Sequence, residues 1–354
     1  MKKTGFVILI FILNFSIIYS QKAGYTPPKG MPRNIIVILA NGMGMNQIEA
    51  GIIQKGSEPS YSRFPVTGFC QAWPKNGKTP SDSSTTQALA TNKSLSGPNN
   101  KYKNIFDLAR EQKMKTGFIT TESVTGPTSK FFTLDNPDKK DNEALALDYL
   151  KSDFDLIIGG GSHYFEKRKD KRNLFKDLKK SGYNLETNSR KIGQIMATKT
   201  LSIIEKYEIS RASDRKDLLT KAALGSMHSL STLDGYLLVI NDTKIEEADS
   251  LNNISLLTEE MIDLDKMTDE ISKQAGGETL VIVIGNYEVG GLIINDNSIG
   301  KKKSRPSVTW QSRKPTASLA PTYAIGPGSE KFSGMYSPEE IYVKLEGMLM
   351  NTRR

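Results

Sequence analysis

The stretch NIIVILANGMG at residues 34–44 decides the fold class. From its second residue to position 40 it is continuously apolar, and Asn41 and two glycines then interrupt the run. A strand that is covered on both faces has such a sequence, whereas a half-exposed strand alternates apolar and polar residues. The stretch therefore predicts a fully buried strand that ends in a glycine-containing loop.

Five similar apolar runs follow along the chain, and amphipathic segments with helical spacing separate them. The predicted strands cover residues 34–40, 115–121, 155–159, 235–240, 279–285 and 321–326, and the predicted helices cover 104–112, 142–152, 255–275 and 337–349. This alternation indicates an α/β fold with a doubly wound, mostly parallel central sheet and helices on both faces. Ligands of such folds bind on the loops at the carboxyl ends of the strands, here 41–44, 122–128, 159–165, 241–250 and 286–291.

The N-terminus has the composition of a secretory signal peptide, with two lysines, an apolar run, and then small or polar residues. The apolar run is short for a membrane span and is interrupted by Asn14 and Ser16, which disfavours an uncleaved anchor. We therefore predict a signal peptide at residues 1–20, an extended lead-in at 21–33 and a single domain at 34–354. We expect export to the periplasm or the extracellular space, with no membrane association after cleavage.

Charge and cysteine content restrict the partners and the sources of stability. The formal net charge is +9, and cations concentrate at residues 166–173 and 300–305. Neither run is interleaved with aromatic residues, so solvated faces are predicted and no nucleic-acid partner is expected. A subordinate interpretation is that either run binds an anionic surface. The single Cys70 cannot form an intrachain disulfide, so stability after export must come from packing.

A polar cluster precedes a helix-prone segment in SDSSTTQALAT, residues 81–91. Side-chain oxygens at a helix start commonly cap the free N–H groups of the first turn, and capping alone would explain Ser83. The same position also suits chemistry, because a hydroxyl at a helix N-terminus faces N–H donors and the positive end of the helix dipole. The cluster by itself leaves both interpretations open.

Six motifs in order resemble the alkaline phosphatase family. They are the first strand and turn at 34–47, the serine segment at 81–91, ITTESVTGPTSKFF at 119–132, DLIIGGGSHYF at 155–165, VIGNYEVGGLII at 283–294 and YAIGPGSEKFSGMY at 323–336. The resemblance implies a three-layer alkaline-phosphatase-like sandwich with Ser83 as the nucleophile of phosphomonoester hydrolysis. It also implies two zinc ions and one magnesium ion, and a homodimer, as in many members.

Most positions that resemble the metal ligands of this family carry other residues. The substituted positions are Asn41, Gly126, Asn241, Glu246, Ser250, Asn286, Tyr287 and Pro315. Asparagine keeps the shape of aspartate but lacks its charge, and zinc prefers histidine nitrogens and carboxylate oxygens. The paired zinc site of the family uses three histidines, whereas this chain has two, His163 and His228. No metal cofactor is therefore expected.

Two functions follow from this pattern. The first is a secreted pseudophosphatase, catalytically degenerate, with a residual pocket for phosphate or another small anion. The phosphate-binding residues of this pocket would be Ser83, Thr128, whose family position belongs to the magnesium shell, and Lys139, with Lys244 as a further cation. The alternative is an active phosphomonoesterase that uses Ser83 with a reduced or rearranged metal site. Its carboxylates would be Asp242, Glu246, Glu247, Asp249 and Glu288, which suit magnesium or calcium.

Overall fold

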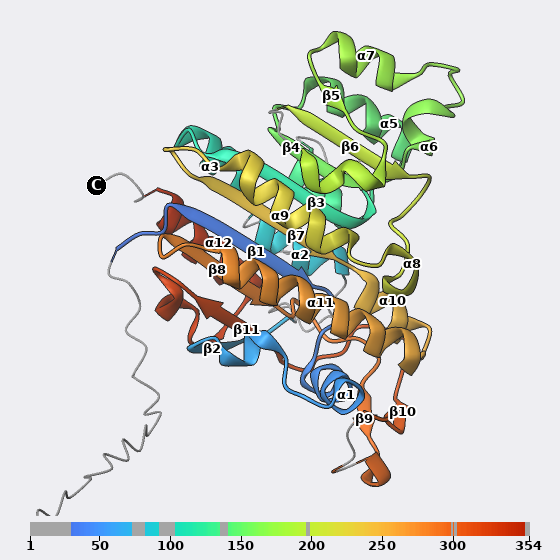
Figure 1. The fold of residues 1–354 in the computed structure, drawn as a ribbon, viewed down its shortest axis with the longest axis vertical. Helices are drawn as coiled ribbons and strands as arrows, with labels where there is room; N and C mark the ends of the chain where they lie inside the picture. The colour runs from blue at the N-terminus through green and yellow to red at the C-terminus, as the bar shows by residue number, and fades with distance from the viewer. Residues whose placement is uncertain are drawn as a thin grey trace, which may run out of the picture.

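The computed structural model describes residues 30–72, 82–91, 103–134, 141–195, 199–298, 300 and 303–350, with side chains from Ser84 onward in the second range. The fold is built on a ten-stranded sheet (Figure 1). In sheet order its strands are β12 (Gly334–Tyr336), β2 (Val66–Cys70), β11 (Ala320–Ile325), β8 (Thr279–Ile284), β1 (Asn34–Ala40), β7 (Tyr236–Asp242), β3 (Lys115–Ser123), β4 (Leu156–Gly160), β6 (Thr200–Glu205) and β5 (Asn184–Leu185).

The centre of the sheet is parallel, as the sequence predicts. Strand β1 pairs in parallel with β7 and β8, and β3 pairs in parallel with β7 and β4. All six predicted strands are confirmed, as β1, β3, β4, β7, β8 and β11. Strand β11, however, runs antiparallel to β8 and β2. An apolar run specifies burial but not direction, so the sequence pattern could not reveal this reversal.

Helices cover both faces of the sheet, and alternate side chains of β1 show why. Ile35, Val37 and Leu39 pack on one helix layer, and Ile36 and Ile38 pack on the other. The first layer contains α2 (Asp82–Thr91), α3 (Ile105–Glu111), α4 (Ser129–Thr133), α5 (Asn142–Asp148), α6 (His163–Glu166), α7 (Leu174–Lys180) and α12 (Pro338–Leu349). The second contains α1 (Met45–Lys55), α9 (Leu218–Leu230), α10 (Lys244–Ser250) and α11 (Ile254–Gln274), and the short α8 (Ala212–Arg215) contacts α11.

The predicted helices are confirmed as α3, α5, α11 and α12. The start of α12 shows how local sequence fixes a boundary. Ser337 Oγ accepts from the backbone N–H of Glu340 at 3.3 Å, and the Glu340 carboxylate accepts from the backbone N–H of Ser337 at 2.7 Å. This reciprocal pair is a capping box. Short 3₁₀ helices lie at Ser60–Arg63, Tyr149–Lys151, Ser189–Gln194, Asp296–Ser298 and Ser329–Phe332.

A separate two-stranded ribbon follows β8 along the chain. Strand β9 (Leu292–Ile294) pairs antiparallel with β10 (Val308–Trp310), and the ribbon lies beside α1 (Figure 1). The predicted signal peptide and residues 21–29 of the lead-in lie outside the described residues. Among the helices that are described, none is both long and apolar enough to cross a membrane.

Candidate functional site

Three asparagines lie where parallel strands end at one edge of the sheet. Asn41 follows β1, Asn241 lies near the end of β7, and Asn286 follows β8 after one glycine. The strand register places Leu39 beside both Asn241 and Ile284. All three asparagines are fully buried. The structure therefore brings together three substituted positions that are far apart in the sequence.

The side chains of these asparagines are joined in one chain of hydrogen bonds. Asn286 Nδ2 donates to Asn41 Oδ1 at 2.7 Å, and Asn41 Nδ2 donates to Asn241 Oδ1 at 2.8 Å. Asn241 Nδ2 then donates to Thr128 Oγ1 at 2.9 Å. We call Asn286, Asn41 and Asn241 the asparagine relay. Each of the three amide nitrogens donates hydrogen bonds to protein oxygens and so links neighbouring side chains.

A backbone group fixes the direction of the relay. Asn41 Nδ2 also donates to the carbonyl oxygen of Asp242 at 2.9 Å, and a carbonyl can only accept. The amide oxygen of Asn41 must therefore face Asn286. Asn286 has a φ of 57°, a left-handed conformation that asparagine tolerates better than most residues. Its Nδ2 also donates to Thr86 Oγ1 on α2 at 3.1 Å, which ties the relay to the serine-bearing helix.

Glu122, which the sequence did not single out, ends the relay. Its Oε1 accepts from Thr128 Oγ1 at 2.6 Å, from the backbone N–H of Thr128 at 3.0 Å and from that of Ser129 at 2.5 Å. Burial raises the pKa of Glu122, and these hydrogen bonds oppose the rise. A β-carbon at position 126 would lie 2.5 Å from the Glu122 carboxyl carbon. Gly126 therefore leaves the space that the Glu122 carboxyl group occupies.

Tyr287 and Glu246, both at substituted positions, bind each other. The Tyr287 side chain is fully buried, and its hydroxyl donates to Glu246 Oε2 at 2.6 Å. Two positions at which the family resemblance implies metal ligands are thus hydrogen-bonded to each other. Ser250 ends α10 and is half-buried. Pro315 lies beside the 286–291 segment, because it forms a backbone bridge with Val289.

The carboxylates considered for a rearranged metal site also have protein partners. Gln47 Nε2 donates to Asp249 Oδ2 at 3.1 Å and to Glu288 Oε1 at 2.9 Å. Trp310 Nε1 donates to the other Asp249 oxygen at 3.1 Å, and Thr316 donates to the other Glu288 oxygen. Burial raises the pKa of Asp249 well above its ordinary range, which favours its neutral form.

The donor set therefore does not fit two zinc ions and a magnesium ion. Such ions need several charged or imidazole ligands converging on one point. In the part of the chain that the structure describes, no three His, Cys, Asp or Glu residues are grouped to hold a metal ion. Amide nitrogens, which cannot coordinate a cation, occupy the space between the strand ends instead.

The structure corrects one element of the predicted anion pocket. Lys244 Nζ lies 2.9 Å from Glu208 and 2.7 Å from Glu247, so its charge is compensated and it is not a free cation for an anion. The Thr128 hydroxyl already donates a hydrogen bond to Glu122 Oε1, so the same hydrogen is not directed at an anion. Lys139 and the side chain of Ser83 lie outside the described residues, so their assignment to the pocket stays a prediction.

Beside the relay, a single guanidinium faces three carboxylates. Arg215 Nη2 lies 2.7 Å from Glu260 and 2.8 Å from Asp263, and 4.0 Å from Asp242. All four side chains are buried. Three potential negative charges therefore share one fixed positive charge. Burial is the main cause that raises the pKa of Glu260 to about 7, and the carboxylate of Asp242 adds to it.

This arrangement predicts a stability that falls as the pH rises between the ordinary glutamate pKa of 4.5 and about 7. In that window the folded protein keeps a proton on Glu260 that the unfolded chain has lost, so proton release accompanies unfolding and higher pH favours it. Denaturant unfolding below and above the window should show the decrease. Glu260→Gln, which keeps the shape but cannot titrate, should flatten it. An unchanged pH profile in this variant would assign the dependence to other groups.

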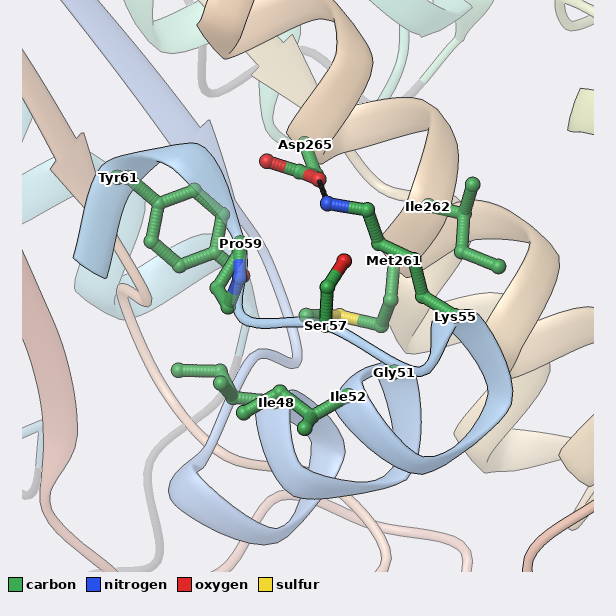
Figure 2. A pocket seen from close by; sticks show the side chains of 10 residues that line it. All are labelled: Ile48, Gly51, Ile52, Lys55, Ser57, Pro59, Tyr61, Met261, Ile262 and Asp265. Carbon is green, nitrogen blue, oxygen red and sulfur yellow. Dashed lines mark hydrogen bonds and ion pairs between the residues drawn. The ribbon is translucent and has the colours of Figure 1, made fainter. Parts of the chain in front are cut away.

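Several hollows lie away from the relay. A cavity of about 10 Å³ lies between α1 and α11. The Lys55–Asp265 ion pair, at 2.5 Å, is part of its lining (Figure 2). This volume holds about one water molecule. Larger hollows of about 350 Å³ and 250 Å³ lie at the amino ends of β1, β7 and β8 and beside β5. Neither of them contains a residue of the relay.

Sequence comparison agrees with the motifs. The sequence model of the family described as Alkaline phosphatase matches residues 32–300. The chain is 26% identical to Alkaline phosphatase 4 of Bacillus subtilis (strain 168) over 295 residues, which cover 75% of this chain and 63% of that protein. It is 20% identical over 333 residues to Alkaline phosphatase 4 of Drosophila melanogaster, covering 72% and 56%. The chain thus spans less than two thirds of the length of these two relatives.

Solved structures give the same relationship. A magnesium-bound variant of TAB5 alkaline phosphatase superposes with a TM-score of 0.79 at 26% identity, covering 91% of this chain and 99% of that one. The TAB5 enzyme from an Antarctic bacterium gives a TM-score of 0.78 at 25% identity with the same coverage. Since the family match extends over most of the chain and the fold agrees, this chain belongs to the alkaline phosphatase family.

Proposed function

We propose that this chain is an exported pseudophosphatase, which keeps the alkaline phosphatase fold but has lost metal-dependent phosphomonoester hydrolysis. The observation that carries the proposal is the asparagine relay. Its three buried amides hydrogen-bond to one another, to Thr86 and to Thr128, where the family resemblance implies charged metal ligands. A residual pocket for phosphate or another small anion at Ser83, with Lys139, belongs to the same proposal.

The chemistry explains why loss of the metals is decisive. A serine hydroxyl is a weak nucleophile unless a base or a bound cation promotes its ionisation. A divalent cation would also stabilise the charge on the transferring phosphoryl group. The relay amides are neutral, and their N–H groups point to protein oxygens rather than outward. The relay therefore supplies neither a base nor a cation that could promote ionisation of a serine hydroxyl.

The alternative function is an active phosphomonoesterase with a rearranged metal site. Glu246, Asp249 and Glu288 lie near the relay and supply the carboxylates that such a site needs. Each of them already accepts hydrogen bonds from tyrosine, glutamine or tryptophan side chains. A metal ion would have to displace these donors, which makes this function the second candidate.

Hydrolysis of an aryl phosphate distinguishes the two functions. We expect the mature protein and its Ser83→Ala variant to react at the same background rate in excess zinc and magnesium, because neutral amides take the place of the charged metal ligands. Added phosphate should raise the melting temperature of the wild type more than that of Ser83→Ala, since binding to the folded state stabilises it. Metal-dependent hydrolysis that Ser83→Ala abolishes would contradict the proposal and establish the alternative.

Export and assembly are further parts of the proposal. The N-terminal sequence supports cleavage near residue 20 and release to the periplasm or the extracellular space. The family resemblance supports a homodimer. N-terminal sequencing of the protein recovered from a secreting host, followed by light scattering, would determine both the cleavage point and the oligomeric state.

A further inference from the structure

The basic run that begins in the loop after α6 continues through α7 and is strongly unbalanced in charge. Residues 167–180 contain eight lysines and arginines and two aspartates, an excess of six positive charges within fourteen residues. The whole chain has a formal net charge of +9. Residues 167–180 therefore account for most of the positive net charge of the chain.

Both aspartates of this segment form ion pairs with its two arginines, so neither of them compensates the charge of a lysine. Arg168 Nη2 lies 2.6 Å from Asp170, and Arg172 Nη2 lies 2.8 Å from Asp177. The hydrogen bond from Arg168 lowers the pKa of Asp170, so this carboxylate stays ionised and paired. The remaining cations form what we call the lysine face: Lys167, Lys169, Lys171, Lys176, Lys179 and Lys180.

The backbone directs these lysines away from the protein. In α7, Leu174 and Leu178 are buried in the core, and the 100° step of a helix places Lys176, Lys179 and Lys180 on the opposite side. All six lysines of the face are exposed, and the loop at 167–173 leads directly into α7, at one end of the molecule in Figure 1. No described carboxylate forms an ion pair with any of them. The nearby Glu166 is exposed, and Glu143 accepts from the backbone N–H of Lys169.

Folding does not require this excess. Cations in the last turn of a helix stabilise it through the helix dipole, which accounts for Lys179 and Lys180 only. Ordinary solvated surfaces intersperse both signs of charge, because a single-sign field repels itself. Six uncompensated lysines on adjacent elements are therefore best explained by an anionic partner.

We propose that the lysine face binds an acidic polysaccharide. The only aromatic residue of the segment, Phe175, stacks on Phe165 at 5.6 Å, so the face offers no free ring on which unpaired nucleobases could stack. The apolar residues of α7 are buried, so nothing inserts into a bilayer. The guanidinium groups of Arg168 and Arg172, which could make bidentate contacts to a phosphate, are paired with aspartates instead. Separate lysine charges match carboxylate or sulfate groups spaced along a polymer.

Binding of the mature protein to immobilised heparin and polygalacturonate tests the proposal. Replacing Lys176, Lys179 and Lys180 with glutamate should weaken binding on the order of tenfold or more, because three attractive charge pairs become repulsive. Added salt should reduce the difference by screening. The matched control replaces the exposed Lys221, Lys266 and Lys331 with glutamate, and should bind almost as tightly as the wild type.

A second variant protects the test against misfolding of α7. Replacing Lys167, Lys169 and Lys171 with glutamine changes only the loop, and should also weaken binding while leaving the melting temperature unchanged. The proposal is wrong if both lysine-face variants bind like the control. It is also wrong if duplex DNA or anionic phospholipid vesicles bind the wild type more tightly than either polysaccharide at the same ionic strength.

Discussion

Replacing Asn41 with aspartate is expected to lower the free energy of unfolding by roughly 3 kcal/mol or more, since it buries a charge and removes a hydrogen-bond donor. The variant removes the Nδ2 group that Asn241 Oδ1 and the Asp242 carbonyl both accept from. A carboxylate would then face two acceptors in a fully buried position. Native domains are stable by about 5–15 kcal/mol, so this loss should be evident in denaturant unfolding. The deficit should shrink at low pH, where a protonated aspartate can donate.

The same chemical change elsewhere provides the control. Asn253 is exposed and caps α11 with its oxygen, which accepts from the backbone N–H of Leu256 at 3.2 Å. Asn253→Asp keeps that acceptor, so its stability should remain near that of the wild type. Zinc and magnesium should not restore the stability of Asn41→Asp, because Asn241 and Asn286 still place neutral amides where charged metal ligands would be needed. If metal ions did restore both stability and phosphatase activity, the relay would be a dispensable remnant of a working metal site.

Replacing Arg215 with methionine should cost about 3–5 kcal/mol of stability, because it removes the guanidinium that compensates the buried carboxylates. Glu260 and Asp263 each lie within 3 Å of the guanidinium, and Asp242 lies 4.0 Å away. The carboxylates would have to take up protons, so the loss should be greater at high pH than at low pH. Thermal and denaturant unfolding across a pH series would measure both effects.

The neighbouring Arg211 gives a matched control for this prediction. It pairs with Glu247 at 2.6 Å, and its side chain is 40% exposed. An exposed pair contributes about 0–1 kcal/mol, so Arg211→Met should have a small effect. Adding Glu260→Gln to Arg215→Met should recover part of the stability by removing one buried charge. Equal losses for Arg211→Met and Arg215→Met would show that the buried cluster has no special role.

The sequence identifies the positions of the relay but not its hydrogen bonds. Asn41, Asn241 and Asn286 each follow or end an apolar run, and parallel strands align their carboxyl ends, so their meeting was predictable. Which amide atom donates to which oxygen depends on the strand register and on the Asp242 carbonyl. These are tertiary features, and no pattern in a single chain encodes them.

The residues that the sequence missed act through contacts that only the fold creates. Glu122 looks like an ordinary loop carboxylate until Gly126 is found to leave room for it. Gln47 lies on α1 and reaches Asp249 and Glu288, which are about two hundred or more positions away in the chain. Lys244 looked like a free cation, although one partner, Glu247, is three residues further along α10. Its other partner, Glu208, follows a different strand. Charge and hydropathy patterns indicate which residues can form hydrogen bonds or ion pairs. Which partner each residue has depends on which side chains the fold brings close together.

The turn after β1 also affects the chemical ageing of this protein. Asn41 precedes Gly42, and in an Asn–Gly dipeptide no side chain hinders the backbone nitrogen from attacking the amide, a reaction that deamidates asparagine. In the folded chain that nitrogen donates to the Tyr287 carbonyl at 3.1 Å, while the Asn41 amide is itself buried and bonded. These contacts keep both the Gly42 nitrogen and the Asn41 side-chain amide from reaching the geometry that the attack requires. Spontaneous conversion of Asn41 to aspartate is therefore confined to chains that have not folded or have unfolded.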